Sequence, residues 1–145
     1  DCLDVHFYAD ADPRWVQRTK FHEHMPYLYK RTDWHADFSD RCRKTATAMA
    51  PMLRQRQRSK LMRFAHWSAE RGMPLTTTES WASWYMFDGP DLDWGWLLDW
   101  AEWSVEDAID AGMWGWTPHN YVQPHFANWA DVRWHRRLND RFLQS

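Results

Sequence analysis

Two short junctions, each centred on a glycine, constrain the fold of this chain most strongly. In the stretches "ERGMPL" and "DAGMWG", a helical pattern ends at Gly72 or Gly112, and an extended segment begins within one or two residues. Glycine is favoured just after a helix because it adopts the left-handed backbone conformation there without steric cost. The chain therefore passes almost directly from helix to strand at two places, whereas each passage from strand to helix is long.

The hydrophobic pattern predicts three strands that alternate with three helices. The expected strands cover residues 2–9, 73–79 and 113–117, the expected helices cover residues 51–72, 91–112 and 130–145, and residues 10–45 are expected to be irregular. This alternation indicates parallel βαβ units and an α/β fold. Short helix-to-strand joins with long strand-to-helix joins are typical of a (β/α)8 TIM barrel, whose long loops form the active face. Since a whole barrel takes about 250 residues, the 145 residues here predict part of a barrel or an open three-unit sheet.

Charge is segregated along the chain, although the net charge is only -2. Residues 41–63 carry eight Lys or Arg side chains and no acid, while the region between Arg71 and Arg133 carries acids and no Lys or Arg. A basic stretch can bind nucleic acid, but oppositely charged flanks on neighbouring helices explain the segregation better. We therefore expect opposite charges to face each other between the helices at 51–72 and 91–112, and no nucleic-acid partner.

Other ligand classes have weak support in the sequence. No apolar run approaches the roughly 18 to 20 residues that span a bilayer, so no membrane association is expected. Cys2 and Cys42 lack metal-type spacing, and they leave the cellular compartment open. His22 and His24 with His35 are an alternative metal site, but no carboxylate or thiolate lies at a suitable spacing. We expect no metal and no cofactor.

Thirteen tryptophans are an unusual number for 145 residues. Tryptophan combines a large apolar ring with one N–H group that needs a hydrogen-bond partner. Some of the rings should line a surface that binds flat, partly apolar ligands, with sugars as the leading class. The alternative is a tryptophan-heavy core, and both interpretations stay open for any single tryptophan.

Polar and aromatic side chains gather where the three predicted strands end. They are His6 and Tyr8 in the first strand, Glu79 at the end of the second, and Trp114 and Trp116 in the third. Side chains alternate along a strand, so His6 and Tyr8 share one face. A carboxylate flanked by a tyrosine and a tryptophan is what a retaining glycosidase needs: the carboxylate attacks the anomeric carbon, and the aromatic ring carries the sugar.

Three motifs, in the same order, resemble those of the cellulase-like glycoside hydrolases of family 5, in clan A. The stretch "DVHFYA" resembles their sixth barrel strand. "PLTTTESW" resembles their seventh, which ends in the nucleophile followed by a tryptophan, and "MWGWTPHNY" is similar to their eighth. The resemblance covers most of the chain except roughly residues 10–50. It implies the C-terminal part of a (β/α)8 barrel, strands six to eight with their helices, so that residues 1–145 would be one fragment of a catalytic domain.

The resemblance also implies roles for individual residues. Glu79 would be the nucleophile, Tyr8 its hydrogen-bond partner and His6 a polar residue of the active site. Trp116, or alternatively Trp114, would be the platform under the sugar. The loops after the strands would line the cleft with further rings and polar groups: Trp15, Phe21, Trp81, Trp84, His119 and Asn120.

The chain departs from the family pattern in one respect. The resemblance implies an acid/base glutamate in an Asn-Glu pair at the end of the fourth strand, and no asparagine here is followed by glutamate. The acid/base residue is then expected upstream of Asp1, and the isolated chain is expected to be inactive. The expected partners are an oligo- or polysaccharide and the rest of the barrel. Two alternatives stay open: a non-catalytic carbohydrate-binding barrel, and a tryptophan-rich interaction module with no role in sugar binding.

Overall fold

The fold was obtained as a computed structural model, which describes residues 1–24, 30–81, 89–117 and 131–145. Its strands are β1 (Leu3–Asp4), β2 (Phe7–Tyr8), β3 (Leu75–Thr77), β4 (Ser80–Trp81) and β5 (Gly115–Trp116). Its helices are the 3-10 helix η1 (Ala9–Ala11) and the α-helices α1 (Pro13–Thr19), α2 (Phe21–His24), α3 (His35–Arg71), α4 (Gly95–Asp110) and α5 (Val132–Leu143). Three expected site residues, Trp84, His119 and Asn120, lie outside the described residues.

A three-stranded parallel sheet in the order β1-β3-β5 forms the centre of the fold, and β2 pairs in parallel with β4 just beyond it. The prediction of parallel strands joined by helices is confirmed. Gly72 and Gly112 both have positive φ values, 60° and 64°, as expected for residues that end helices. The single strand expected at 2–9 is instead two short strands, because the chain changes its pairing partner from β3 to β4 after Val5.

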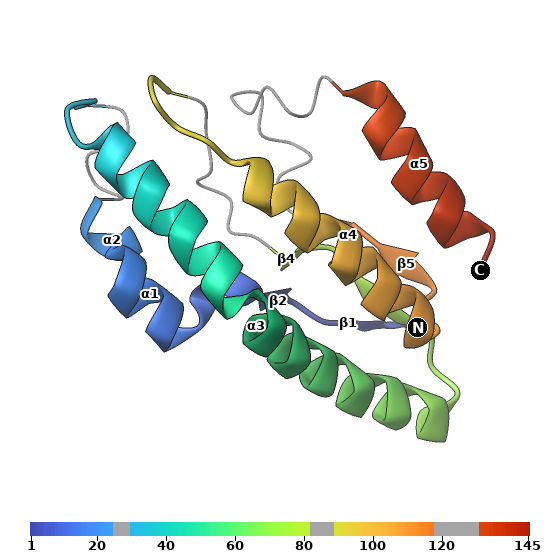
Figure 1. The fold of residues 1–145 in the computed structure, drawn as a ribbon. Coiled ribbons are helices and arrows are strands. Elements are labelled where there is room, and N and C mark those ends of the chain that lie inside the picture. The colour runs from blue at the N-terminus through green and yellow to red at the C-terminus, as the bar shows by residue number, and fades with distance from the viewer. Residues whose placement is uncertain (25–29, 82–88, 118–130) are drawn as a thin grey trace.

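Helices α3, α4 and α5 lie on one face of the sheet (Figure 1). They bury an apolar cluster against the strands, composed of Val5, Phe7, Leu61, Leu75, Ala108 and Met113. A second, larger cluster gathers around Trp15, Phe38 and Trp100, where α1, α3 and α4 meet. At about 25 cal/mol per Å² of buried apolar surface, these two clusters supply the main stabilisation of the fold.

Helix α3 is 37 residues long and begins at His35, so the predicted helix start at Pro51 is wrong. Pro51 has no N–H to donate to the carbonyl of Thr47, and its ring crowds the preceding turn. Figure 1 shows α3 bent between its cyan and green segments, as interior prolines commonly cause. The residues buried in its first half recur every three or four positions, as on one helical face: Phe38, Cys42, Ala46, Met49 and Leu53.

None of the helices in the described part of the chain, α3 included, is both long and apolar enough to cross a membrane.

Residues 10–45 are largely helical where the structure describes them, and the irregular connection predicted there is wrong. Asp12 caps α1 by accepting a hydrogen bond from Arg14 N at 2.9 Å, and Pro13 occupies the first turn. Trp15 is 0% exposed and Phe21 is 2% exposed. These two rings therefore belong to the core and do not line a cleft.

Most of the tryptophan side chains that the structure describes are also in the core. The ring of Trp15 lies 5.0 Å from those of both Trp96 and Trp100, measured between centroids. The core interpretation of the tryptophan content is confirmed for six rings: Trp15, Trp94, Trp96, Trp100, Trp103 and Trp134. Among the described tryptophans, Trp67 and Trp114 have exposed side chains.

The segregated charges meet between α3 and α4, as predicted. Arg54 lies 2.7 Å from Glu106 and 3.1 Å from Asp107. Arg58 lies 2.9 Å from Asp107 and 2.7 Å from Asp110. The side chain of Asp107 is 3% exposed, and it holds both arginines at once. Arg54 and Arg58 of the basic stretch therefore have a structural role in joining the two helices.

We expect Asp107→Ala to lower the free energy of unfolding by about 2 to 4 kcal/mol, because it leaves two arginines without their shared buried partner. Asp110 is 54% exposed, so Asp110→Ala should cost less than about 1 kcal/mol. Both substitutions replace aspartate by alanine on α4, so both variants gain about the same helix propensity, and the difference between them reports the lost ion pairs. Urea unfolding followed by far-ultraviolet circular dichroism measures both losses, and equal losses would contradict the prediction.

Candidate functional site

The candidate site lies at the carboxyl end of β3, where the chain bends after Thr77. Alternation along a strand would direct Glu79 to the same face as Leu75 and Thr77, which the helices cover. The bend redirects Glu79, and the hydroxyl of Thr77 stabilises it by donating a hydrogen bond to the Glu79 carbonyl oxygen at 2.8 Å. The Glu79 carboxylate thereby reaches Tyr8.

Asp4 holds the same bend from the neighbouring strand. Its two carboxylate oxygens accept hydrogen bonds from the N–H of Thr78 at 2.9 Å and from the Thr78 hydroxyl at 2.6 Å. Nε2 of His6 lies 3.2 Å from Asp4 Oδ2 and 3.0 Å from Thr78 Oγ1. Burial tends to raise the pKa of Asp4, but the hydrogen bonds from Thr78 and then the contact with His6 outweigh it and lower the pKa below its usual value.

Tyr8 and His6 both approach the Glu79 carboxylate. The Tyr8 hydroxyl donates a hydrogen bond to Glu79 Oε2, and His6 Nδ1 lies 3.6 Å from the same oxygen. Burial, followed by the hydrogen bond to Glu79, raises the pKa of Tyr8 above its ordinary value of 10.0. Tyr8 therefore stays protonated and remains a donor at neutral pH. The Glu79 side chain is 36% exposed, so a ligand can reach it.

This arrangement gives a carboxylate that is oriented and accessible. A carboxylate whose rotation is restricted by a tyrosine hydroxyl can attack an electrophilic carbon or accept a proton. The structure therefore brings together the three residues expected to form the catalytic group, Glu79, Tyr8 and His6.

The expected sugar platforms do not lie beside this group. Trp116 aligns with Thr77, which places it on the face that the helices cover, and it packs against both apolar clusters. Trp114 is 74% exposed and lines a pocket of about 390 Å³ next to α5. On β5, the residue that faces away from the helices is Gly115, where an added Cβ would lie 3.5 Å from a carbon of Thr76. Trp81 pairs with Tyr8 through the backbone of β4 and β2.

The histidines of the alternative metal site make separate contacts. Arg41 donates to Nε2 of His24 at 2.8 Å, and burial together with the charge of Arg41 lowers the pKa of His24. Nδ1 of His35 lies 2.9 Å from the carbonyl oxygen of Pro90. Within the described ranges, no group of three or more His, Cys, Asp or Glu side chains could hold a metal ion.

Asp4 and Thr78 were not among the residues predicted for the site, yet they fix the bend that positions Glu79. A sequence signal for Asp4 was present, since Asp4, His6 and Tyr8 follow one another at a spacing of two and therefore share one face of a strand. The role of Thr78 is harder to predict from the sequence, because Thr78 is the third of three consecutive threonines and nothing distinguishes it from the other two.

Comparisons with known proteins point to sugars. A crystal structure of a protein from Parabacteroides distasonis, named as a candidate glycoside hydrolase, is similar to this chain with a TM-score of 0.70 and 25% identity. The match covers 97% of this chain and 37% of that one, so the chain spans little more than a third of its neighbour's length. No curated protein matches the chain.

The sequence-family comparison covers nearly the whole chain. Residues 1–143 match the family described as "Sugar-binding cellulase-like". Together with the structural neighbour, this match supports a role in sugar binding or of the glycoside-hydrolase kind. The chain belongs to the family of sugar-binding, cellulase-like proteins.

Proposed function

We propose that Glu79 is the nucleophile of a retaining glycoside hydrolase that acts on β-linked oligo- or polysaccharides. In this proposal, residues 1–145 contribute strands six to eight of a (β/α)8 barrel to a longer protein. The observation that carries it is the hydrogen bond from Tyr8 to the accessible Glu79 carboxylate at the carboxyl end of a parallel sheet. The active sites of such barrels lie at that end. The strand order β1-β3-β5, with helices on one face, is the order that three consecutive barrel units would have.

Each residue of the group would have a distinct role. The Glu79 carboxylate attacks the anomeric carbon and forms a glycosyl ester as the glycosidic bond breaks, and water later hydrolyses this ester. The Tyr8 hydroxyl holds one carboxylate oxygen, which limits rotation and favours the attacking geometry. His6 links Asp4 and Glu79, since its two ring nitrogens lie near one carboxylate each. It therefore keeps the bend and the nucleophile in register.

Retaining hydrolysis also requires an acid that protonates the leaving oxygen. Asp4 is linked to Glu79 through His6, but it is poorly suited to this role. Its pKa is lowered because the hydrogen bonds from Thr78 outweigh the effect of burial, whereas a general acid at neutral pH needs a raised pKa. We therefore infer that the acid comes from outside the described residues, in the rest of the barrel.

A second candidate function is sugar binding without hydrolysis. It is favoured by the family's description as sugar-binding. In that case the same carboxylate and hydroxyl groups would accept and donate hydrogen bonds to sugar hydroxyls, and no ester would form. The two candidates differ in whether Glu79 becomes covalently attached to a sugar.

One prediction concerns the nucleophile, and it is tested in the longest protein that the reading frame of this chain encodes. We expect Glu79→Gln to reduce hydrolysis across a panel of aryl β-glycosides by about 1,000-fold or more, since an amide is a very poor nucleophile. Oligosaccharide binding, measured by calorimetry, should be retained. Glu70→Gln makes the same change at a surface glutamate that is 55% exposed on α3, and it should leave turnover unchanged.

A mechanism-based inhibitor that forms a covalent glycosyl ester separates the two candidate functions. Attachment of the label to Glu79, located by mass spectrometry, supports the hydrolase. Binding of oligosaccharide with no label favours the sugar-binding protein, and turnover retained in Glu79→Gln contradicts the assignment of the nucleophile.

A further prediction concerns the pH dependence of the bend. Because the pKa of Asp4 is lower in the folded protein than its ordinary value of 3.8, its stabilisation is present above that value and is lost as the pH falls through the folded pKa. We expect Asp4→Asn to cost about 1 kcal/mol near pH 6, after allowance for solvent screening. This difference from the wild type should shrink below pH 4, about the ordinary pKa of aspartate.

Asp140→Asn, at an exposed aspartate on α5, is the matched control for that measurement. Urea unfolding at a series of pH values gives both differences. A cost of Asp4→Asn that stays constant down to pH 3, about one unit below the ordinary aspartate pKa, would contradict the role assigned to the ionised carboxylate.

A further inference from the structure

The imidazole ring of His6 lies between two carboxylates, one from β1 and one from the bend after β3. Its Nε2 is 3.2 Å from Asp4 Oδ2, and its Nδ1 is 3.6 Å from Glu79 Oε2. A neutral imidazole carries one proton, so only one of its two nitrogens is a hydrogen-bond donor. The nitrogen that carries this proton therefore decides what the ring presents to Glu79.

Both groups beside Nε2 of His6 act as acceptors. The Thr78 hydroxyl donates its single proton to Asp4 Oδ2 at 2.6 Å, so its oxygen can only accept at its 3.0 Å contact with Nε2. The effect of burial on Asp4 is outweighed by the hydrogen bonds from Thr78, which keep the pKa of Asp4 below its usual value. The ionised carboxylate can also only accept. The hydrogen-bond network therefore assigns the proton of the neutral ring to Nε2.

The alternative tautomer, with the proton of the neutral ring on Nδ1, is less favourable. It would place the lone pair of Nε2 against the lone pairs of Asp4 Oδ2 and Thr78 Oγ1. In return, Nδ1 would gain only the longer contact with Glu79 Oε2, at 3.6 Å. That oxygen already accepts a hydrogen bond from the Tyr8 hydroxyl.

The nitrogen that faces Glu79 is consequently the one that gains and loses a proton. Because Nε2 carries a proton in both forms of the ring, the neutral form presents a lone pair at Nδ1 and the cationic form presents an N–H. The His6 side chain is 47% exposed, so solvent can deliver or remove this proton. Histidine exchanges such a proton near neutral pH.

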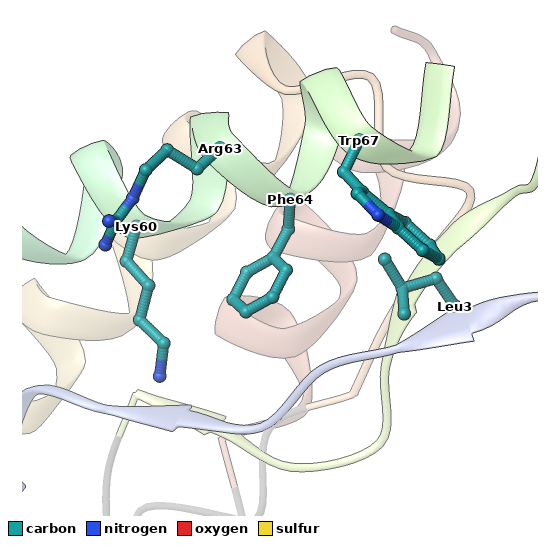
Figure 2. A pocket seen from close by; sticks show the side chains of 5 residues that line it. All are labelled: Leu3, Lys60, Arg63, Phe64 and Trp67. Carbon is teal, nitrogen blue, oxygen red and sulfur yellow. The ribbon is translucent and has the colours of Figure 1, made fainter. Parts of the chain in front are cut away.

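The nearby cation Lys60 approaches the backbone of His6. Lys60 Nζ lies 3.4 Å from the His6 carbonyl oxygen, and Figure 2 shows the Lys60 side chain extending from α3 toward the strands. Side-chain alternation directs the His6 ring to the face of the sheet opposite to α3. Within the described ranges, the ionisable side chains at the ring nitrogens are Asp4 and Glu79, with Tyr8 beside Glu79.

We propose that Asp4 is a positioning residue that acts on Glu79 through His6. Together with the Thr78 hydroxyl, it holds the proton of the neutral ring on Nε2, so that Nδ1 exchanges its proton beside the nucleophile. This inference rests on the function proposed for Glu79, and it adds a second role for Asp4 to the support of the bend.

The proton on Nδ1 of His6 affects the two steps of retaining hydrolysis in opposite ways. When Nδ1 lacks the proton, the ring donates nothing to the Glu79 carboxylate as it attacks the anomeric carbon. When water hydrolyses the glycosyl ester, the electron pair of the breaking C–O bond returns to Glu79, and a protonated Nδ1 stabilises the oxygen that receives it. The proton that the water loses goes to the acid/base residue, outside the described residues.

Nitrogen NMR tests the tautomer directly, in the longest protein that the reading frame encodes, with isotopically labelled histidine. The spectrum distinguishes a ring nitrogen that carries a proton from one that does not, and His6→Gln identifies the His6 signals by their loss. At about pH 8.5, well above the ordinary histidine pKa, we expect wild-type His6 to carry its proton on Nε2. A neutral ring with its proton on Nδ1 would overturn the proposal.

Asp4→Asn should move this proton to Nδ1. The N–H of Thr78 needs an acceptor, so the amide oxygen takes the place of Oδ1 and the amide NH2 group takes the place of Oδ2, next to Nε2. Nε2 then faces a donor and becomes the acceptor. Thr78→Val keeps the carboxylate and should keep the proton on Nε2. Asp140→Asn, at an exposed aspartate of α5, is the matched control and should also leave the tautomer unchanged.

An unchanged tautomer in Asp4→Asn contradicts the proposal, as does a proton moved to Nδ1 in Thr78→Val. If Asp4→Asn does not fold, the wild-type spectrum and Thr78→Val still decide between the two tautomers.

The rate at which the mechanism-based inhibitor labels Glu79 measures the attack step alone. Between about pH 5.5 and about pH 7.5, on either side of the ordinary histidine pKa, we expect the wild-type rate to rise about 3-fold more than that of His6→Gln. The reason is that Nδ1 of His6 loses the proton that faces the attacking oxygen. In Asp4→Asn, Nδ1 keeps its proton, so the rise should match that of His6→Gln.

A purely structural role for Asp4 predicts a different result. Loss of the bend alone would slow labelling in Asp4→Asn by the same factor at both pH values, and that outcome would overturn the proposal. The NMR spectra require no turnover, so the two proposals can fail separately. No label on Glu79 in the wild type contradicts the nucleophile, whereas a labelled Glu79 beside a neutral His6 protonated at Nδ1 contradicts the role of Asp4 alone.

Discussion

The packing of α3 and α4 onto the strands is the constraint on which the rest of the structure depends. Each strand is only two or three residues long, so the backbone ladder alone is too small to stand without a packed face. Leu61 from α3 and Ala108 from α4 close over Leu75 in the central strand. The arginines of α3 and the carboxylates of α4 then tie the two helices together. The strands, and the site at their carboxyl end, take their positions from this packing.

The candidate site arises from an interruption of the regular strand pattern. A strand that continued beyond Thr77 would turn Glu79 toward the helices. Asp4 and Thr78 instead stabilise a bend, and the bend presents the carboxylate to Tyr8. The polar groups at the bend are satisfied by one another, which lets an irregular backbone persist at the end of a sheet. Departures from local regularity of this kind are common at functional sites.

Sequence reasoning recovered the parts of the fold that follow from local signals. The structure contains the glycines that end α3 and α4, and its strands alternate with helices as predicted. It also contains the complementary charges on the two helices. The same reasoning placed His6, Tyr8 and Glu79 at neighbouring strand ends, where they do make contact. The bend at Thr78 was not predictable, because it depends on a carboxylate more than 70 residues away in sequence.

The other differences have separate physical causes. The helical pattern before Pro51 was obscured because proline usually marks a helix start, although here it lies inside α3 and bends it. Trp116 faces the helices because it aligns with Thr77 of β3, while Gly115 aligns with Thr76 on the opposite face. Whether a tryptophan is in the core or at a ligand surface depends on such neighbours, and composition alone does not contain that information.

The length of α3 has a consequence for how the molecule loses its structure. The first half of this helix contributes Phe38, Cys42 and Met49 to the tryptophan-rich cluster, while its second half contributes Leu61 to the cluster beneath the sheet. One continuous helix, α3, therefore belongs to both apolar clusters. Opening either cluster disrupts the helix that both share. The amide hydrogens in the two clusters should therefore exchange with solvent at a common opening free energy, as one cooperative unit. The bend at Pro51 lets one helix follow both surfaces, and in this way a residue that usually interrupts helices makes the cooperative unit larger.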